Sequence, residues 1–232
     1  MPLHIQPSIF HTYPDFRCGV IVAKGIENTK EKIDLPWDAM QQELVKHFDS
    51  YEAPSRHPHI LAWRQAYKTF GTDPQKYRCS VEALVRRTLK GEPPMHINAL
   101  VDIYNYISLK YVVPIGGEDL DAVQGAIVLD QAKGDEPFIR LGGEENEPPD
   151  PGEVVYKDEL GVLCRRWNWR EADRTKLTES TRNAILEIET LGGYDATRLQ
   201  AALDECTKLI QEHCGGEVHV QVLDKEQATA VC

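Results

Sequence analysis

The sequence lacks the features that direct a chain into a membrane, a secretory pathway or a disulfide-bonded or zinc-stabilised fold. No apolar run among its 232 residues approaches the roughly 20 residues that span a bilayer, and the first residues carry no basic flank before an apolar stretch. Its six cysteines include no C-x-x-C pair, which argues against a disulfide framework and against a zinc knuckle. We therefore expect a cytoplasmic protein with no membrane contact, no cofactor and no metal.

The motifs of several large enzyme classes are also missing. There is no G-x-G-x-x-G after a predicted strand, no G-x-x-x-x-G-K-[ST], no G-x-S-x-G and no H-E-x-x-H. The sequence therefore argues against four enzyme classes: dinucleotide dehydrogenases, P-loop nucleotidases, serine hydrolases and zincins. His57 and His59 are the only close histidine pair, and they have no third ligand nearby in the sequence.

The chain is acidic overall, but its basic residues gather in two segments. Lys and Arg total 26 against 37 Asp and Glu, a net charge of −11. Residues 64–90 hold seven basic and two acidic side chains, and residues 164–182 hold six basic and three acidic ones. Two interpretations are open: a pair of solvated charged faces, or a basic patch on an acidic body that holds a polyanion locally and disfavours indiscriminate binding.

Local patterns predict a mixture of helices and strands without a regular βαβ repeat. Helices are expected over residues 36–48, 59–70, 81–90, 97–111 and 196–214. Strands are expected over residues 16–26, 125–131, 137–141, 153–157, 161–169, 183–189 and 218–222. Proline and paired glycines in residues 112–119 predict a turn, and residues 142–152 a surface loop. The fold class is therefore α+β, with mixed sheets and packed helices.

Residues 164–175 are unusual for a structural strand, because four arginines and two tryptophans interleave with an amide and two carboxylates. An extended conformation would place Arg166, Asn168 and Arg170 on one face, and the two tryptophans with Arg165 on the other. Arginine forks suit phosphate oxygens, and tryptophan rings suit base stacking. The structural alternative is a salt-bridged edge strand with a half-buried tryptophan pair. Glu171, flanked by arginines, can stay ionised and orient a water or a substrate ammonium.

A series of short, ordered matches over residues 64–189 resembles a known family. The matches are Asn105-Tyr106-Ile107-Ser108-Leu109-Lys110, Pro114-Ile115-Gly116-Gly117-Glu118-Asp119-Leu120-Asp121, Gly125-Ala126-Ile127-Val128, Val162-Leu163-Cys164 leading to Glu171, and Thr181-Arg182-Asn183-Ala184-Ile185-Leu186-Glu187. In this order they are similar to the central tRNA-editing region of the phenylalanyl-tRNA synthetase β-subunit, here as a free-standing protein. We expect residues 1–232 to form a single editing-type domain on which a helix and strand from residues 190–232 pack.

The resemblance implies hydrolysis of the ester between a wrong amino acid and the terminal ribose of tRNA. Glu171 falls nearest to a glutamate of the family's pocket, and Gly116 stands where the family has a histidine. Residues 165–170 replace the family's glycine-rich run before that glutamate. A pocket relined in this way is expected to handle an amino acid other than tyrosine.

These observations assign candidate roles. The candidate catalytic residues are Glu171, Asn168 and Arg166. The candidate substrate-binding residues are Asn105, Gly116, Gly117, Glu118, Asp119, Arg165, Trp169 and Arg170. The candidate tRNA-binding residues are Lys76, Arg78, Arg86 and Arg87. The expected partner is the aminoacylated 3′ end of tRNA, and an aminoacyl-tRNA synthetase is a second candidate partner.

Three functional hypotheses follow. The first is a deacylase that clears mischarged tRNA in trans. The second is a non-catalytic module that binds aminoacyl-tRNA or an amino-acid-like ligand, which the missing histidine favours because a family pocket can outlive its chemistry. The third is a structural domain whose arginines form internal salt bridges, which predicts no salt-dependent binding of tRNA.

Overall fold

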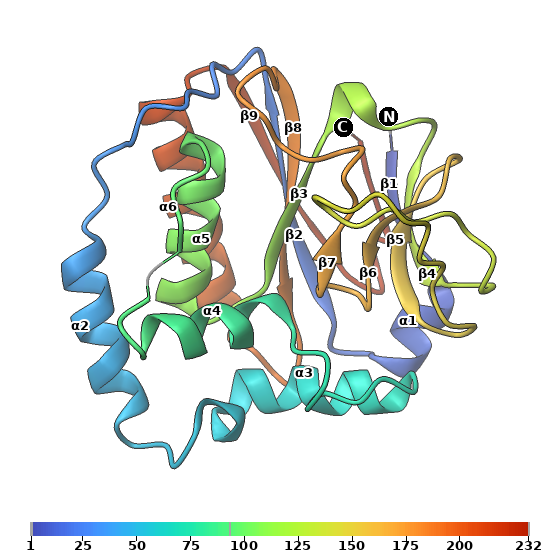
Figure 1. Cartoon of the computed structure of the whole chain (residues 1–232), viewed down its shortest axis with the longest axis horizontal. Helices are drawn as coiled ribbons and strands as arrows, with labels where there is room; N and C mark the ends of the chain where they lie inside the picture. The colour runs from blue at the N-terminus through green and yellow to red at the C-terminus, as the bar shows by residue number, and fades with distance from the viewer. Residues whose placement is uncertain (1, 93, 232) are drawn as a thin grey trace.

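The computed structural model describes residues 2–92 and 94–231, which form two β-sheets and the helices packed against them (Figure 1). The helices are α1 (Pro7–Thr12), α2 (Trp37–Phe48), α3 (Pro58–Thr69), α4 (Ser80–Thr88), α5 (Ala99–Tyr111) and α6 (Ala196–His213), with short 3-10 helices η1 (Pro54–Arg56) and η2 (Leu120–Ala122). The strands are β1 (Pro2–Ile5), β2 (Arg17–Lys24), β3 (Ile115–Asp119), β4 (Ile127–Gln131), β5 (Val154–Lys157), β6 (Val162–Arg165), β7 (Arg170–Glu171), β8 (Asn183–Thr190), β9 (Glu217–Leu223) and β10 (Thr229–Val231).

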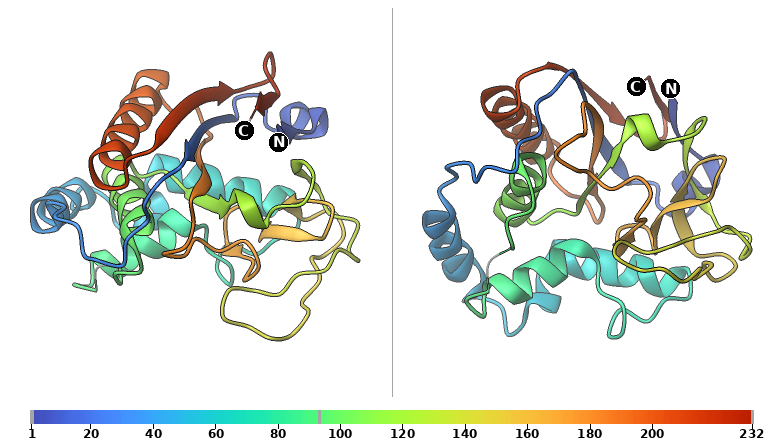
Figure 2. Two further views of the ribbon diagram at one scale, coloured as in Figure 1. Left: turned by 90° about the horizontal axis from the view of Figure 1, so that it is seen from above. Right: turned by 45° about the horizontal axis from the view of Figure 1, so that its top comes forward.

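The two sheets confirm the predicted α+β class. One has six strands in the order β10-β1-β4-β5-β6-β7, and the other has four in the order β3-β8-β2-β9. All pairs are antiparallel except β1 with β4, which is parallel. The first and last strands pair with each other, so the two ends of the chain lie side by side (Figure 2).

The helices lie on one face of the four-stranded sheet and beneath both sheets. Helices α5 and α6 cover the sheet, α2 lies outside them, and α3 and α4 run along the bottom of the view in Figure 1. Gly19 in β2 lets α6 pack closely against this strand, because a Cβ at position 19 would lie 2.7 Å from Leu203 Cδ2. A single cluster of buried apolar side chains joins residues of both sheets and these helices. No helix among the described residues is long and apolar enough to span a membrane.

The predicted helices are confirmed, with ends that differ by at most two residues. Capping groups set the boundaries of the two longest helices, α5 and α6. The Asn98 side chain accepts a hydrogen bond from Val101 N–H at 3.0 Å at the start of α5. That helix ends at Val112, which adopts a left-handed conformation with φ 56°. The Asp195 side chain accepts from the N–H groups of Thr197 and Arg198 at the start of α6.

Three predictions about local structure were wrong. Residues 115–119 form strand β3 and not a turn, because they lie in antiparallel register with residues 184–188 of β8. Residues 137–141 make only isolated bridges, at Ile139 and Arg140. Residues 161–169 are not one extended strand, because β6 ends at Arg165 and a turn follows. Elements β1, α1, β7 and β10 were not predicted, since each is too short to show a period of its own.

Candidate functional site

The turn between β6 and β7 holds the candidate catalytic residues, and its conformation is unusual. Arg166 and Trp167 both have positive φ, at 48° and 67°, a left-handed geometry that side chains other than glycine seldom adopt. The Trp167 ring is fully buried in edge-to-face contact with the rings of Tyr13, Phe16 and Trp63, at centroid distances of 4.8, 5.0 and 5.1 Å. Core packing of one ring therefore fixes the turn and the residues that follow it.

The buried carboxylate of Glu189 on β8 anchors this turn to the second sheet. It accepts hydrogen bonds from Trp167 Nε1 at 2.7 Å, from the Tyr156 hydroxyl at 2.7 Å and from Asn168 Nδ2 at 2.8 Å. Burial raises its pKa to about 7, an effect that the three donors oppose. The Asn168 Oδ1 atom accepts from the Tyr67 hydroxyl at 2.9 Å. Both ends of the Asn168 amide are thus engaged in holding the turn.

Three further glutamates meet beside Glu189, where β3, β7 and β8 approach one another. Glu118 and Glu187 are buried, and burial raises the pKa of both well above the usual value. Burial and the neighbouring Glu187 raise the pKa of Glu171 to about 8. The negative charge of Glu171 adds to the effect of burial on the pKa of Glu118, so the two carboxyls do not titrate independently.

Gly116 makes room for Glu171 in this cluster. A Cβ at position 116 would lie 2.8 Å from Glu171 Oε1. At the next position, a Cβ on Gly117 would collide with the Leu186 side chain and lie 2.7 Å from the Ile185 carbonyl oxygen. The paired glycines therefore let β3 pass close to both β8 and the Glu171 carboxyl.

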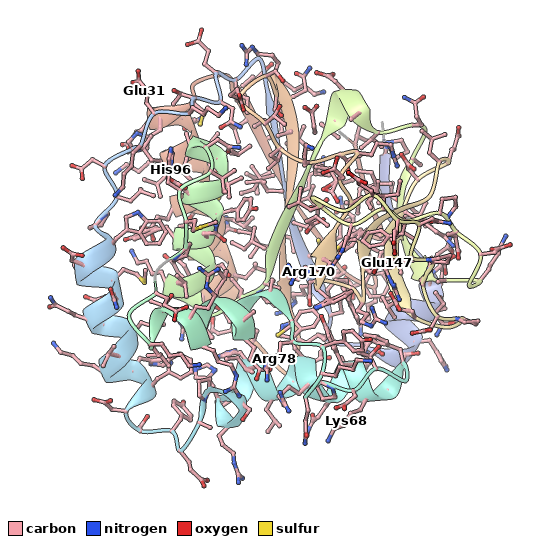
Figure 3. The ribbon with its side chains drawn as sticks, in the orientation of Figure 1. Glu31, Lys68, Arg78, His96, Glu147 and Arg170 are labelled. Atoms are coloured by element: carbon pink, nitrogen blue, oxygen red, sulfur yellow. The ribbon has the colours of Figure 1, made fainter. Side chains whose placement is uncertain are left out.

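A groove with a volume of about 830 Å³ opens from Glu171 toward α4. Its lining includes six basic side chains, namely Lys76, Arg78, Arg86, Arg87, Lys90 and Arg170. Among the described residues, Arg86 is the only one of the six with an ion-pair partner, Glu82 at 2.9 Å. Figure 3 shows Arg78 and Arg170, which come from segments far apart in the sequence, near the same end of α4. The groove is therefore strongly electropositive, although the whole chain is acidic.

Two aromatic rings lie in the groove among these cations. The rings of Tyr77 and Trp169 meet edge to face, with centroids 4.9 Å apart. The Arg166 guanidinium lies 3.8 Å from the Tyr77 centroid and 4.7 Å from that of Trp169. Partly exposed aromatic faces between cations are the arrangement that holds a nucleobase next to its phosphate.

The structure brings most of the predicted site residues together. The groove is lined by nine of them, namely Lys76, Arg78, Arg86, Arg87, Asn105, Asn168, Trp169, Arg170 and Glu171. A small recess behind Glu171 is lined by three more, namely Gly116, Gly117 and Glu118. Two segments nearly 100 residues apart in the sequence, around Arg78 and Trp169, thus face the same space. The glycines of β3, which were predicted to form the opposite wall, line the small recess and not the groove.

Three predicted residues contact other partners. The buried Arg165 guanidinium binds Glu153 through two hydrogen bonds of 2.8 and 3.0 Å, and so lies away from the groove. Arg166 stacks on Tyr77 and pairs with Asp150 at 3.2 Å. Asp119 accepts hydrogen bonds from the Thr181 hydroxyl at 2.7 Å and from the backbone of η2. The internal salt bridges that the structural hypothesis predicted are therefore real for Arg165 and Arg166, but not for the groove cations other than Arg86.

The sequence reasoning missed Glu187, Glu189 and Tyr77. The two glutamates alternate with Leu186 and Ile188, which is typical of a strand with one solvent face, so nothing in the sequence indicates that both faces are buried. Tyr77 lies within the basic segment of residues 64–90, and aromatic rings among cations are typical of sites that bind single-stranded nucleic acid. In the part of the chain that the structure describes, no three His, Cys, Asp or Glu side chains are arranged to hold a metal ion.

Comparison with known proteins places the chain in a family. The model of the B3/4 domain matches residues 62–215, which is more than half of the chain, so the chain belongs to the B3/4 domain family. The phenylalanine–tRNA ligase β-subunit of Aquifex aeolicus is 30% identical over 152 residues, covering 53% of this chain and 19% of the relative. The same subunit of Aliivibrio fischeri is 28% identical over 155 residues, covering 57% and 19%. The chain therefore spans about a fifth of the length of these relatives.

A solved structure also matches. An N-terminal fragment of the phenylalanyl-tRNA synthetase β-subunit from Pyrococcus horikoshii aligns with 93% of this chain and 49% of the fragment, at a TM-score of 0.45 and 14% sequence identity.

Proposed function

We propose that the protein hydrolyses the ester bond of mischarged aminoacyl-tRNA, acting in trans. The observation that carries this proposal is a single electropositive groove that ends at a partly buried glutamate, Glu171, which has no ion-pair partner among the described residues. The relatives are named as subunits of a tRNA ligase, which makes a tRNA end the polyanion to consider first. An aminoacyl-tRNA synthetase as a partner and a cytoplasmic location are further parts of this proposal.

The groove supplies the contacts that a tRNA 3′ end requires. Arg78, Arg87 and Lys90 are exposed and without acidic partners among the described residues, so their charge is available to phosphates. The Tyr77 and Trp169 rings offer a stacking surface for the terminal adenine. A base held there keeps the terminal ribose within the groove that leads to Glu171.

Glu171 is the candidate general base. Its pKa of about 8 lies close to neutral pH, where proton transfer by a positioned carboxylate is most effective. In the proposed reaction a water attacks the ester carbonyl and gives one proton to Glu171. That proton then passes to the ribose oxygen as the carbon–oxygen ester bond breaks, which releases the free amino acid and tRNA with a restored hydroxyl.

The edge of β3 supplies a donor for the developing oxyanion. Backbone groups of alternate residues in an antiparallel strand point to opposite edges. Asp119 N–H donates to Thr175 O at 2.9 Å on the edge that is not paired with β8, so Gly117 N–H, two residues earlier, faces the same edge. An amide held by a sheet is preorganised, which is the property that oxyanion stabilisation needs.

Asn168 and Arg166, predicted as catalytic, serve here as positioning residues. Asn168 ties the turn to Glu189, and Arg166 packs the two aromatic rings of the groove. Arg165 and Asp119 have no part in the proposed reaction, because other residues of the chain occupy their side chains.

The test is deacylation of a panel of mischarged tRNAs by the wild type and by Glu171→Gln, with Glu145→Gln, an exposed carboxylate, as the matched control. We expect Glu171→Gln to lower the rate by roughly 10²–10⁴-fold and to leave tRNA affinity within about twofold. The control should behave as the wild type. Equal rates for wild type and Glu171→Gln would remove Glu171 from the mechanism, and protection of the ester without hydrolysis would favour the binding module.

A further inference from the structure

Four glutamates line a small recess behind Glu171, and its Tyr156, Trp167 and Asn168 donors are already bonded to Glu189. Its volume is about 10 Å³, enough for one water-sized group, and Glu171 and Asn168 line both this recess and the groove. The carboxyls of Glu118, Glu187 and Glu189 complete its wall. Within residues 2–92 and 94–231, none of the four glutamates forms an ion pair.

Two of these carboxyls lack the donors that buried acceptors normally have. The Glu187 side chain is 5% exposed, and no other side chain of the described residues donates a hydrogen bond to it. The Oε2 atom of Glu171 is buried and has no hydrogen-bond partner among the described residues. Glu189, by contrast, has three donors. Buried acceptors without donors are costly to the folded state, and a ligand that supplies donors removes that cost.

The size and chemistry of the recess identify the ligand class. The carboxyls that are left without side-chain donors favour a group that only donates, and a volume near that of one water excludes an aromatic or branched side chain. A primary ammonium has three N–H donors, a positive charge and no acceptor. Every aminoacyl ester carries such a group one carbon away from the scissile carbonyl.

We propose that the recess formed by Glu118, Glu171, Glu187 and Glu189 binds the free α-ammonium of the aminoacyl ester. This inference rests on the proposed function and gives it a substrate class: esters with a free amino group are accepted, and N-acylated or peptidyl esters are excluded. The ammonium would seat the carbonyl beside Glu171 and leave the amino-acid side chain in the wider groove. Specificity for the amino acid is then set by the groove and not by the recess.

Binding of a non-hydrolysable probe tests this inference independently of catalysis. We use 3′-alanylamino-3′-deoxyadenosine, whose amide replaces the ester, and the same compound with an acetylated α-amine. Isothermal titration calorimetry of the wild type should show at least tenfold weaker binding after acetylation. Glu187→Gln should bind the free amine at least tenfold more weakly and bind the acetylated probe as the wild type does. Glu145→Gln is the matched control and should not change either affinity.

The outcomes separate this inference from the proposed function. Equal affinity for the two probes, or no binding of either at millimolar concentration, overturns the ammonium site. Ester hydrolysis measured on the same preparations shows whether the hydrolytic activity stands without it. If acetylation also slows hydrolysis by the wild type but not by Glu187→Gln, the ammonium contact acts in the reaction itself. A fold defect is excluded by comparing the melting temperatures of the variants, since a buried carboxyl replaced by a neutral amide does not leave an unpaired charge.

Discussion

The buried carboxyl cluster should make the protein less stable as the pH rises through the neutral range. Glu171 has a pKa of about 8 in the folded state against an ordinary value of 4.5. The folded protein therefore holds a proton that the unfolded chain releases, and stability falls as the pH rises from about 4.5 through about 8. Burial also raises the pKa of the three neighbouring carboxyls, Glu118, Glu187 and Glu189, so their ionisation lowers stability as the pH rises in the same way. The positive charge of Arg174 opposes this effect at Glu118.

The structure sets the size of the effect. The interval from 4.5 to about 8 corresponds to about 5 kcal/mol, at roughly 1.4 kcal/mol for each pKa unit. The part of this interval that lies above about pH 6 spans about two pH units and corresponds to about 2–3 kcal/mol. For a chain of this length, that corresponds to a fall in melting temperature of about 5–10 °C between about pH 6 and about pH 9.

The assay is thermal unfolding followed by circular dichroism at several pH values at constant ionic strength. The wild type and Glu145→Gln should lose stability across this range, and Glu171→Gln should lose clearly less, because its amide does not ionise. The measured ester hydrolysis plays no part in this result. A wild-type melting temperature that stays constant or rises between about pH 6 and about pH 9 would refute the reasoning, since a raised carboxyl pKa can only act with this sign.

Two further predictions concern the groove and the glycine beside Glu171. Arg87→Ala should weaken tRNA binding at low salt and lower the slope of log K against log salt by about 0.7–0.9. The control Lys208→Ala, on α6 outside the groove, should change neither the affinity nor the slope. Identical slopes for the wild type and Arg87→Ala would place Arg87 away from the phosphates. Gly116→Ala should slow ester hydrolysis by roughly tenfold or more with little change in tRNA affinity, because its Cβ would lie 2.8 Å from Glu171 Oε1. Unchanged kcat in Gly116→Ala would show that the Glu171 carboxyl can move without consequence.

Much of the fold follows from local sequence patterns. The apolar spacing of residues 97–111 and the capping residues Asn98 and Asp195 predict α5 and α6 with ends that are wrong by at most two residues. Runs of β-branched residues likewise predict β2, β8 and β9. Helical and strand periodicities are properties of a segment and its neighbours, so the sequence alone determines them.

The site depended on contacts between distant segments. Paired glycines next to a proline predicted a turn at residues 112–119, but pairing with β8 made residues 115–119 an edge strand. Arginines and tryptophans in alternation predicted one extended strand, but the burial of Trp167 among aromatic rings from two other segments turned the chain at Arg166.

The sequence by itself determined the α+β class, the main helices and the existence of two basic segments. Only the tertiary structure decided which charges are free. Arg165 and Arg87 are the same residue type in equally basic segments, yet Glu153 neutralises the first, while the second stays exposed in the groove. The physical reason is that the energy of a charge depends on its burial and its partners in space, and the sequence records neither.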